Sequence, residues 1–195
     1  MKRTSESLKL PKYWKRFYGW LYGNKFWSAF LSKNWVQTFL TLGNNNRLSQ
    51  SVLREIKRND KVLQIGVTFG HQIDDTAERI GQYGQYDLMD VSLTQLNLVK
   101  QKYQYVFPQM DFIQQNGADK IKKPGYGYDV VICYMLLHEV PPQTKSKIVG
   151  NALSVIKENG KVIFVDYHRP LTYHPLRYIV RMINRLWPPF AEKLW

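Results

Sequence analysis

The central part of the chain alternates short apolar runs with amphipathic segments. Each apolar run has the length of a buried strand, and the segment after it repeats apolar residues at helical spacing. We expect strands at residues 61–65, 86–89, 110–114, 129–133 and 161–165, and helices at 48–56, 72–80, 93–102, 143–155 and 175–186. This alternation predicts an α/β fold, in which a mainly parallel sheet is covered by helices on both faces.

The first predicted strand runs into a turn that contains two glycines. Gly66 and Gly70 stand on either side of Thr68, and Asp90 ends the next apolar run, 20 residues beyond Gly70. Such a turn lets a ligand approach the backbone, and a carboxylate at the tip of the second strand accepts hydrogen bonds from ribose hydroxyls. The spacing predicts a nucleotide site, with a ligand-free turn of similar shape as the alternative. NAD is disfavoured, because the turn lacks the G-x-G-x-x-G pattern.

This segment resembles motif I of the class I methyltransferases that depend on S-adenosylmethionine (SAM). Two of the three glycines of that motif are present, and Gln64 stands where an acid is usual. The resemblance implies a Rossmann-like methyltransferase fold. It also extends to the segment 112–119, where Asn116 takes the place of an Asp that contacts adenine and can accept the same hydrogen bond. The SAM-binding residues implied in this way are Gln64, Gly66, Thr68, Gly70, Asp90, Val91, Asn116 and Gly117.

The ends of the fourth and fifth predicted strands carry the candidate catalytic side chains. Neighbouring parallel strands end at one edge of the sheet, where open α/β folds bind their ligands, so these side chains are expected at one site. Imidazoles beside a carboxylate can bind a divalent metal or move protons, although each of them alone can also be structural. The catalytic candidates are Tyr134, His138, Glu139, Tyr167 and His168, and the metal candidates are His138, Glu139 and His168.

The charge of the chain indicates an anionic partner. The net charge is +13 and the isoelectric point is about 9.7, which suits nucleic acid or an acidic membrane surface. Enzymes that methylate the amino groups of nucleic-acid bases carry D/N-P-P-Y/F after the fourth strand, whereas this chain has Tyr134-Met135-Leu136 there. Nucleic acid is therefore an unlikely partner, and an anionic membrane is the expected one.

The first 40 residues are basic and aromatic. They contain eight Lys or Arg against one acid, and residues 13–39 contain eleven aromatic side chains. A basic, Trp-rich amphipathic segment is typical of the lipid headgroup boundary, and the alternative is a pair of helices that cover the mouth of the site. One segment could do both. We divide the chain into an aromatic-rich helical N-terminal segment, residues 1–45, and a SAM-binding Rossmann-like domain, residues 46–195.

The expected location follows from what the sequence lacks. Cys133 is the only cysteine, which excludes a disulfide framework and suits a reducing compartment. The sequence has no apolar stretch of membrane-spanning length and no signal-peptide core after Met1. We expect a cytoplasmic protein in peripheral contact with the inner membrane.

Several of these motifs together resemble the rhodoquinone biosynthesis methyltransferase-like proteins. The match begins in the Trp- and Tyr-rich N-terminal segment and continues through Gly43-Asn44 before Arg47-Leu48, Leu63-Gln64, Phe69-Gly70, and Asp90-Val91 with Gln95-Leu96. It extends to Leu136-Leu137-His138-Glu139-Val140-Pro141, Asp166-Tyr167-His168-Arg169-Pro170 and His174-Pro175-Leu176-Arg177. The resemblance implies that a ring methoxy group of ubiquinone is replaced by an amino group, with SAM as the nitrogen source and a divalent metal such as manganese.

The neutral side chain of Gln64 fits amino transfer. An acid at this position would help to hold the methionine nitrogen of SAM as an ammonium, which has no lone pair with which to attack a quinone. Two alternatives stay open. One is an ordinary SAM-dependent methyltransferase that acts on a quinone or another lipophilic small molecule, and the other is a non-catalytic basic module that binds RNA or a protein partner.

Overall fold

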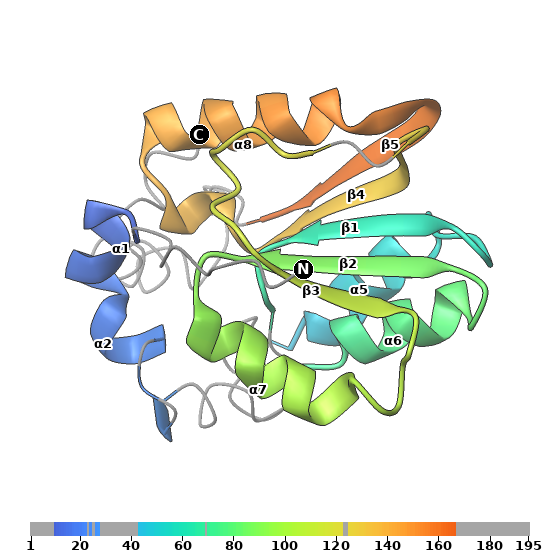
Figure 1. The fold of residues 1–195 in the computed structure, drawn as a ribbon, viewed down its shortest axis with the longest axis horizontal. Helices are drawn as coiled ribbons and strands as arrows, with labels where there is room; N and C mark the ends of the chain where they lie inside the picture. Colours follow the sequence, from blue (N-terminus) through green and yellow to red (C-terminus); the bar gives the residue numbers. More distant parts are fainter. Residues whose placement is uncertain are drawn as a thin grey trace, which may run out of the picture.

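A computed structural model of the protein describes residues 10–22, 24, 26–27, 43–68, 70–122 and 125–166. Its centre is a five-stranded parallel sheet in the order β3-β2-β1-β4-β5 (Figure 1). The strands are β1 (Lys61–Ile65), β2 (Gln85–Asp90), β3 (Met110–Gln114), β4 (Tyr128–Tyr134) and β5 (Ile156–Val165). The helices are α1 (Lys12–Phe17), α2 (Gly19–Tyr22), α5 (Asn45–Leu53), α6 (Gln72–Ile80), α7 (Leu93–Tyr103) and α8 (Pro142–Ser154), and a 3₁₀ turn, η1, spans Leu137–Glu139. The predicted α/β fold class is confirmed.

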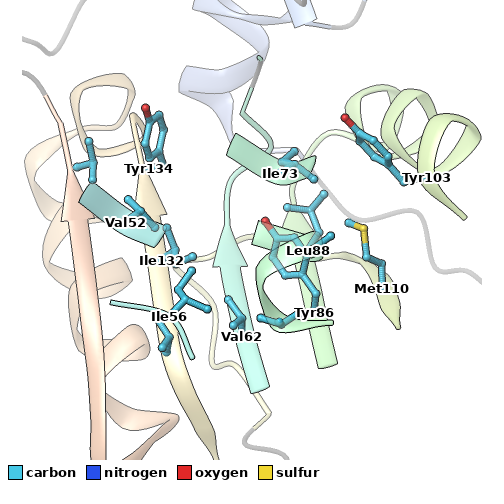
Figure 2. Packing of buried hydrophobic residues seen from close by; sticks show 14 of the residues in the cluster. Val52, Ile56, Val62, Ile73, Tyr86, Leu88, Tyr103, Met110, Ile132 and Tyr134 are labelled. Atoms are coloured by element: carbon cyan, nitrogen blue, oxygen red, sulfur yellow. The ribbon is translucent and has the colours of Figure 1, made fainter. Parts of the chain in front are cut away.

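Apolar side chains on the two faces of the sheet form two separate cores. Successive residues of a strand point to opposite faces, so Val62 belongs to one core and Leu63 to the other. The first core lies under α5, α6 and α7, and Figure 2 shows how its side chains meet between strands and helices. The second core lies under α8, where Ile148 and Ala152 are buried. Both faces are therefore covered, which explains why the strands are continuous apolar runs.

The register of the sheet brings the carboxyl ends of its strands to one edge. Ile65 of β1 is aligned with Met89 of β2 and with Cys133 of β4. Figure 1 shows α1 and α2 beside this edge. No helix in the described part of the chain is long and apolar enough to cross a membrane.

The predicted elements agree with the structure except at some boundaries. The helix expected at 48–56 begins earlier, at Asn45, and the helix expected at 175–186 lies outside the described residues. The strand expected at 161–165 begins at Ile156 instead. Residues 157–160 are polar and end in glycine, which suggests a turn. In the structure Tyr128 aligns with Ile156, and the register then shifts so that Val130 aligns with Lys161.

Gly160 is required by this irregular pairing of β4 and β5. A Cβ atom there would lie 2.6 Å from Cγ1 of Ile156 and 2.9 Å from the carbonyl oxygens of Tyr128 and Asp129. We expect Gly160→Ala to lower the free energy of unfolding by about 1–3 kcal/mol, as overpacking does, in urea denaturation. Gly150 of α8 is the matched control, because a Cβ there meets nothing within 4 Å and Ala favours a helix. Equal stability of the two variants would contradict this account.

Candidate functional site

The glycine turn after β1 is held in place by the carboxylate of Asp90. One oxygen of Asp90 accepts a hydrogen bond from the backbone N–H of Val67 at 2.7 Å, and the other accepts one from Ser92 at 2.7 Å. Burial raises the pKa of Asp90 to about 6, although hydrogen bonds from the backbone N–H groups of Val67, Ser92 and Val91 lower it. Each oxygen keeps a second lone pair for a ligand hydroxyl. Asp90 therefore lies where a ribose would need an acceptor.

Gln64 starts a chain of buried polar side chains beneath the turn. Its amide oxygen accepts a hydrogen bond from the hydroxyl of Tyr86 at 2.5 Å, and its amide nitrogen donates to Oγ1 of Thr68 at 3.3 Å. Thr68 donates to Gln72 at 2.9 Å, and Gln72 donates to Thr76 at 3.0 Å. Gln64 is completely buried, so the structure gives it a supporting place under the turn rather than one at its surface.

Gly66 and Gly70 both have positive φ angles, of 94° and 89°. Each also has a close neighbour, because a Cβ on Gly66 would lie 3.3 Å from Cδ1 of Leu136, and one on Gly70 would lie 3.0 Å from Nδ2 of Asn45. The turn therefore needs glycine for its backbone and for its packing. Thr68 is 9% exposed and uses its hydroxyl inside the polar chain, which leaves its backbone as the part that can face a ligand.

The ends of β2 and β3 bring the other predicted SAM contacts beside Asp90. Val91 is half-buried, and Gln115 donates its backbone N–H to the carbonyl oxygen of Asp90 at 3.0 Å. The side-chain oxygen of Asn116 accepts the backbone N–H of Ala118 at 3.0 Å, so it forms a local turn and has one lone pair left. Gly117 lies against β1, where a Cβ would be 2.7 Å from Cγ2 of Ile65. In the structure Gly117 therefore allows the loop after β3 to pack closely against β1.

Tyr134 is the last residue of β4 and lies at the same edge. It is 3% exposed, and its hydroxyl is buried without a hydrogen-bond partner within the described residues. Burial raises the pKa of this phenol to about 12, so it stays protonated at neutral pH and can act only as a neutral donor or acceptor. An unpaired buried hydroxyl costs free energy that a ligand could recover.

His138 is paired with Asp166, which was not among the candidates. Nδ1 of His138 lies 2.7 Å from one oxygen of Asp166, and the other oxygen accepts the backbone N–H groups of Leu137 at 2.7 Å and His138 at 3.2 Å. Asp166 follows β5 directly, so it joins the end of β5 to η1 after β4. An acceptor at Nδ1 favours the tautomer with its proton on that nitrogen and the lone pair on Nε2.

The predicted metal site lies only in part among the described residues. They contain no group of three or more His, Cys, Asp or Glu that could hold a metal ion, and the carboxylate beside His138 belongs to Asp166 rather than Glu139. His168 and Tyr167 lie outside the described residues, so their predicted roles stay predictions. We derive no step through a metal.

The N-terminal segment contributes Tyr13 to this edge. Tyr13 packs against the core on the α8 side of the sheet. Burial first, and then the negative charges of Glu139, Asp90 and Asp119, raise the pKa of its phenol to about 12. Tyr18, just after α1, is completely buried. Helix α1 thus lies over the carboxyl edge on which the predicted SAM contacts converge.

Comparison with solved structures identifies the fold. The chain is similar to a SAM-dependent methyltransferase from Aquifex aeolicus, with 16% identity, a TM-score of 0.63, and coverage of 88% of this chain and 81% of that one. It is also similar to the YcgJ protein of Bacillus subtilis, with 20% identity, a TM-score of 0.60, and coverage of 74% and 60%. A complex of DhpI with SAM and HEP matches with 18% identity and a TM-score of 0.55, covering 80% and 68%. A search of curated sequences returned no match.

The family follows from the sequence itself. The model of the methyltransferase domain family matches residues 62–160, which include the glycine turn, Asp90 and the segment through α8. The chain belongs to this family and has the fold of SAM-dependent methyltransferases. The protein is therefore a SAM-dependent transferase, and the carboxyl edge carries the residues that are predicted to contact SAM.

Three residues of this edge were missed by sequence reasoning. Asp166 lies 28 positions beyond His138, and Asn45 lies 25 positions before Gly70, so no local spacing connects either pair. Tyr13 belongs to a segment whose aromatic content suits a lipid surface equally well. Of these three residues only Asp166 could have been found from the sequence, because it begins the D-Y-H-R-P segment directly after a predicted strand.

We expect Asp90→Asn to weaken SAM binding by about tenfold or more, since charge-assisted hydrogen bonds contribute roughly 1.5–3 kcal/mol. The ligand-free carboxyl, with its pKa of about 6, gains its proton as the pH falls through that value. Wild-type affinity should therefore decline below pH 6, whereas the variant should show no such decline. Calorimetric titration from pH 5 to 8 measures both. An unchanged affinity at pH 7.5 would rule out the ribose assignment.

Asp166→Asn should change the tautomer of His138. If the amide oxygen of the new side chain at position 166 still accepts the backbone N–H groups, its NH₂ group faces Nδ1 of His138. Nδ1 must then accept a hydrogen bond from that NH₂ group. We expect the ring proton to move to Nε2 in ¹⁵N-resolved NMR spectra, and the free energy of unfolding to fall by about 1–3 kcal/mol. Asp119→Asn, at an exposed acid of the same edge, is the control. A His138 ring signal identical to that of the wild type would contradict the pairing.

Proposed function

We propose that this SAM-dependent transferase acts on a membrane quinone and converts ubiquinone to rhodoquinone, by replacing a ring methoxy group with an amino group taken from SAM. The proposal rests on the motif resemblance and on two features of the site. One is the unpaired hydroxyl of Tyr134, and the other is the neutral polar chain that begins at Gln64. It places the quinone ring over the carboxyl ends of β4 and β5.

Tyr134 is the observation that carries the choice of acceptor. A quinone presents ring carbonyl oxygens on an apolar body, so it satisfies a buried phenol donor while it remains compatible with apolar surroundings. Met135 and Val165, which join Tyr134 in the core on the α5 side, provide such surroundings. As a nucleophile adds to the ring, charge develops on a carbonyl oxygen, and a fixed phenol donor stabilises that charge.

Gln64 supports amino rather than methyl transfer. A carboxylate at this position would favour the charged ammonium of the donor, and an ammonium cannot attack a ring carbon. Gln64 is neutral, and its amide nitrogen donates to the carbonyl oxygen of Gly66 at 3.1 Å and to Thr68. Position 64 therefore supplies no charge that would hold this nitrogen in its unreactive form.

The overall amino transfer can be written in balance. A C–N bond forms at the ring carbon while its bond to the methoxy oxygen breaks, and methanol leaves with a proton from the nitrogen. Release of the nitrogen then needs one water molecule and the passage of two electrons from the donor carbon to the ring. The products are an aminohydroquinone, methanol and the 2-oxo acid of the donor. Proton transfers of this kind suit His138 in the tautomer that Asp166 favours.

Ordinary methyl transfer is the second candidate, because it is the activity that the family match suggests most directly. It would act on a quinone or another lipophilic small molecule and would release S-adenosylhomocysteine instead of a 2-oxo acid. The two candidates therefore differ in both products. A non-catalytic module would yield neither.

The reaction is tested by incubating the protein with ubiquinone and SAM labelled with ¹⁵N at its amino group, with and without added manganese. We expect ¹⁵N in the aminohydroquinone, or in the aminoquinone to which oxygen of the air oxidises it, detected by mass spectrometry together with methanol. An additional methyl group without the label would show quinone methylation and overturn amino transfer, and an unchanged quinone would overturn the proposed acceptor.

Tyr134→Phe tests the role of the phenol in the same assay. It removes one hydroxyl and leaves the ring in the core, so turnover should fall by about tenfold or more while SAM affinity stays constant. Tyr105→Phe is the control, because Tyr105 is 89% exposed and precedes β3 at the opposite edge of the sheet.

A further inference from the structure

An exposed aromatic cluster consists of Trp20 on α2 and of Phe26 and Trp27 shortly after that helix, and the proposed reaction makes no use of it. Trp20 is 56% exposed, Phe26 is 71% exposed and Trp27 is 40% exposed. Their rings contact one another edge to face, with centroids 6.3 Å apart for Trp20 and Trp27 and 5.6 Å apart for Phe26 and Trp27. We propose that this N-terminal aromatic cluster, together with the cations of α1, docks onto an anionic lipid bilayer.

The cations stand on the helix that precedes the cluster. Lys12, Lys15 and Arg16 are all exposed, and α1 contains no acid. The sequence has no Asp or Glu between Glu6 and Glu55, so no carboxylate of this stretch offsets these charges. The surface is therefore cationic as well as aromatic.

A bilayer fits this combination better than other occupants. Trp rings settle where one side meets apolar chains and the other meets water, and Lys and Arg at the same level meet lipid phosphates. A protein interface of ordinary composition is depleted in Lys, and here two of the three cations are Lys. The net charge of +13 adds attraction to any anionic surface.

The opposite side of the N-terminal segment is anchored to the SAM site. Tyr18 is completely buried, and Tyr13 packs on the core beside Asp90 and Glu139. Docking through the cluster would therefore bring the bilayer to the edge of the sheet at which the site opens (Figure 1). This inference goes beyond the proposed function, because it depends on the surface and not on the chemistry of the acceptor.

The test is sedimentation of the full-length protein with vesicles of phosphatidylglycerol and phosphatidylcholine, and with vesicles of phosphatidylcholine alone. We expect binding to the mixed vesicles that salt weakens, and little binding to the neutral ones. The triple variant Trp20→Ala, Phe26→Ala, Trp27→Ala should bind the mixed vesicles about tenfold less tightly or weaker still. The variant Lys12→Ala, Lys15→Ala, Arg16→Ala should lose the preference for anionic lipid.

The chain offers a matched aromatic control. Tyr83, Tyr105 and Tyr126 are 78%, 89% and 91% exposed and precede β2, β3 and β4 at the opposite edge of the sheet. Their triple replacement by Ala should leave vesicle binding unchanged. Equal effects of the two triple variants would overturn the proposal. The proposal would also be overturned if the Trp20, Phe26, Trp27 variant still bound vesicles but no longer retained an RNA oligonucleotide, or no longer self-associated. Circular dichroism and SAM titration of every variant identify any loss that comes from unfolding.

Discussion

The carboxylate of Asp90 is the constraint on which the site depends. It joins two turns that are not adjacent in sequence, since it accepts backbone N–H groups from Val67 after β1 and from Ser92 after β2. Backbone N–H groups in such turns would otherwise lack partners, and a fixed acceptor holds both turns in one conformation. The same charge is partly desolvated, which raises its pKa to about 6. A ribose that donated its hydroxyl protons here, as we predict, would stabilise the ionised form, so that folding and ligand binding would use one group.

Beneath this turn the protein uses neutral hydrogen bonds in place of a charge. The chain from Tyr86 through Gln64, Thr68 and Gln72 satisfies each buried amide and hydroxyl in turn. A carboxylate at position 64 would need a cation or several donors in the same space, because an isolated buried charge is costly. The amide avoids that cost while it still fixes the turn. The amide at position 64 also changes the electrostatic field that bound SAM would meet, because this field then comes from Asp90 and the backbone and not from residue 64.

The strands and the Asp90 position could be predicted from sequence because both are local signals. A strand covered on both faces is a continuous apolar run, and Asp90 follows from its distance to Gly70. The start of β5 could not be predicted, because residues 157–160 have turn composition and pair only through a register shift with β4. The partner of His138 was also hidden. Asp166 reaches it across the sheet edge, and the adjacent Glu139 is the acid that sequence favours.

Tyr134 and Asp166 show two different uses of burial at the same edge. The side chain of Asp166 is 9% exposed, and its carboxylate pairs with the ring of His138 and accepts the backbone N–H groups of Leu137 and His138. These contacts compensate its charge within the protein and fix η1 and the ring of His138. Tyr134 is buried with no hydroxyl partner in the described part of the chain, which lowers stability by an uncompensated desolvation. A protein retains such a cost most readily where a bound molecule removes it, and strain of this kind gathers at functional sites. Asp166 therefore belongs to the framework of the site, and the phenol of Tyr134 is the group that we propose binds the acceptor.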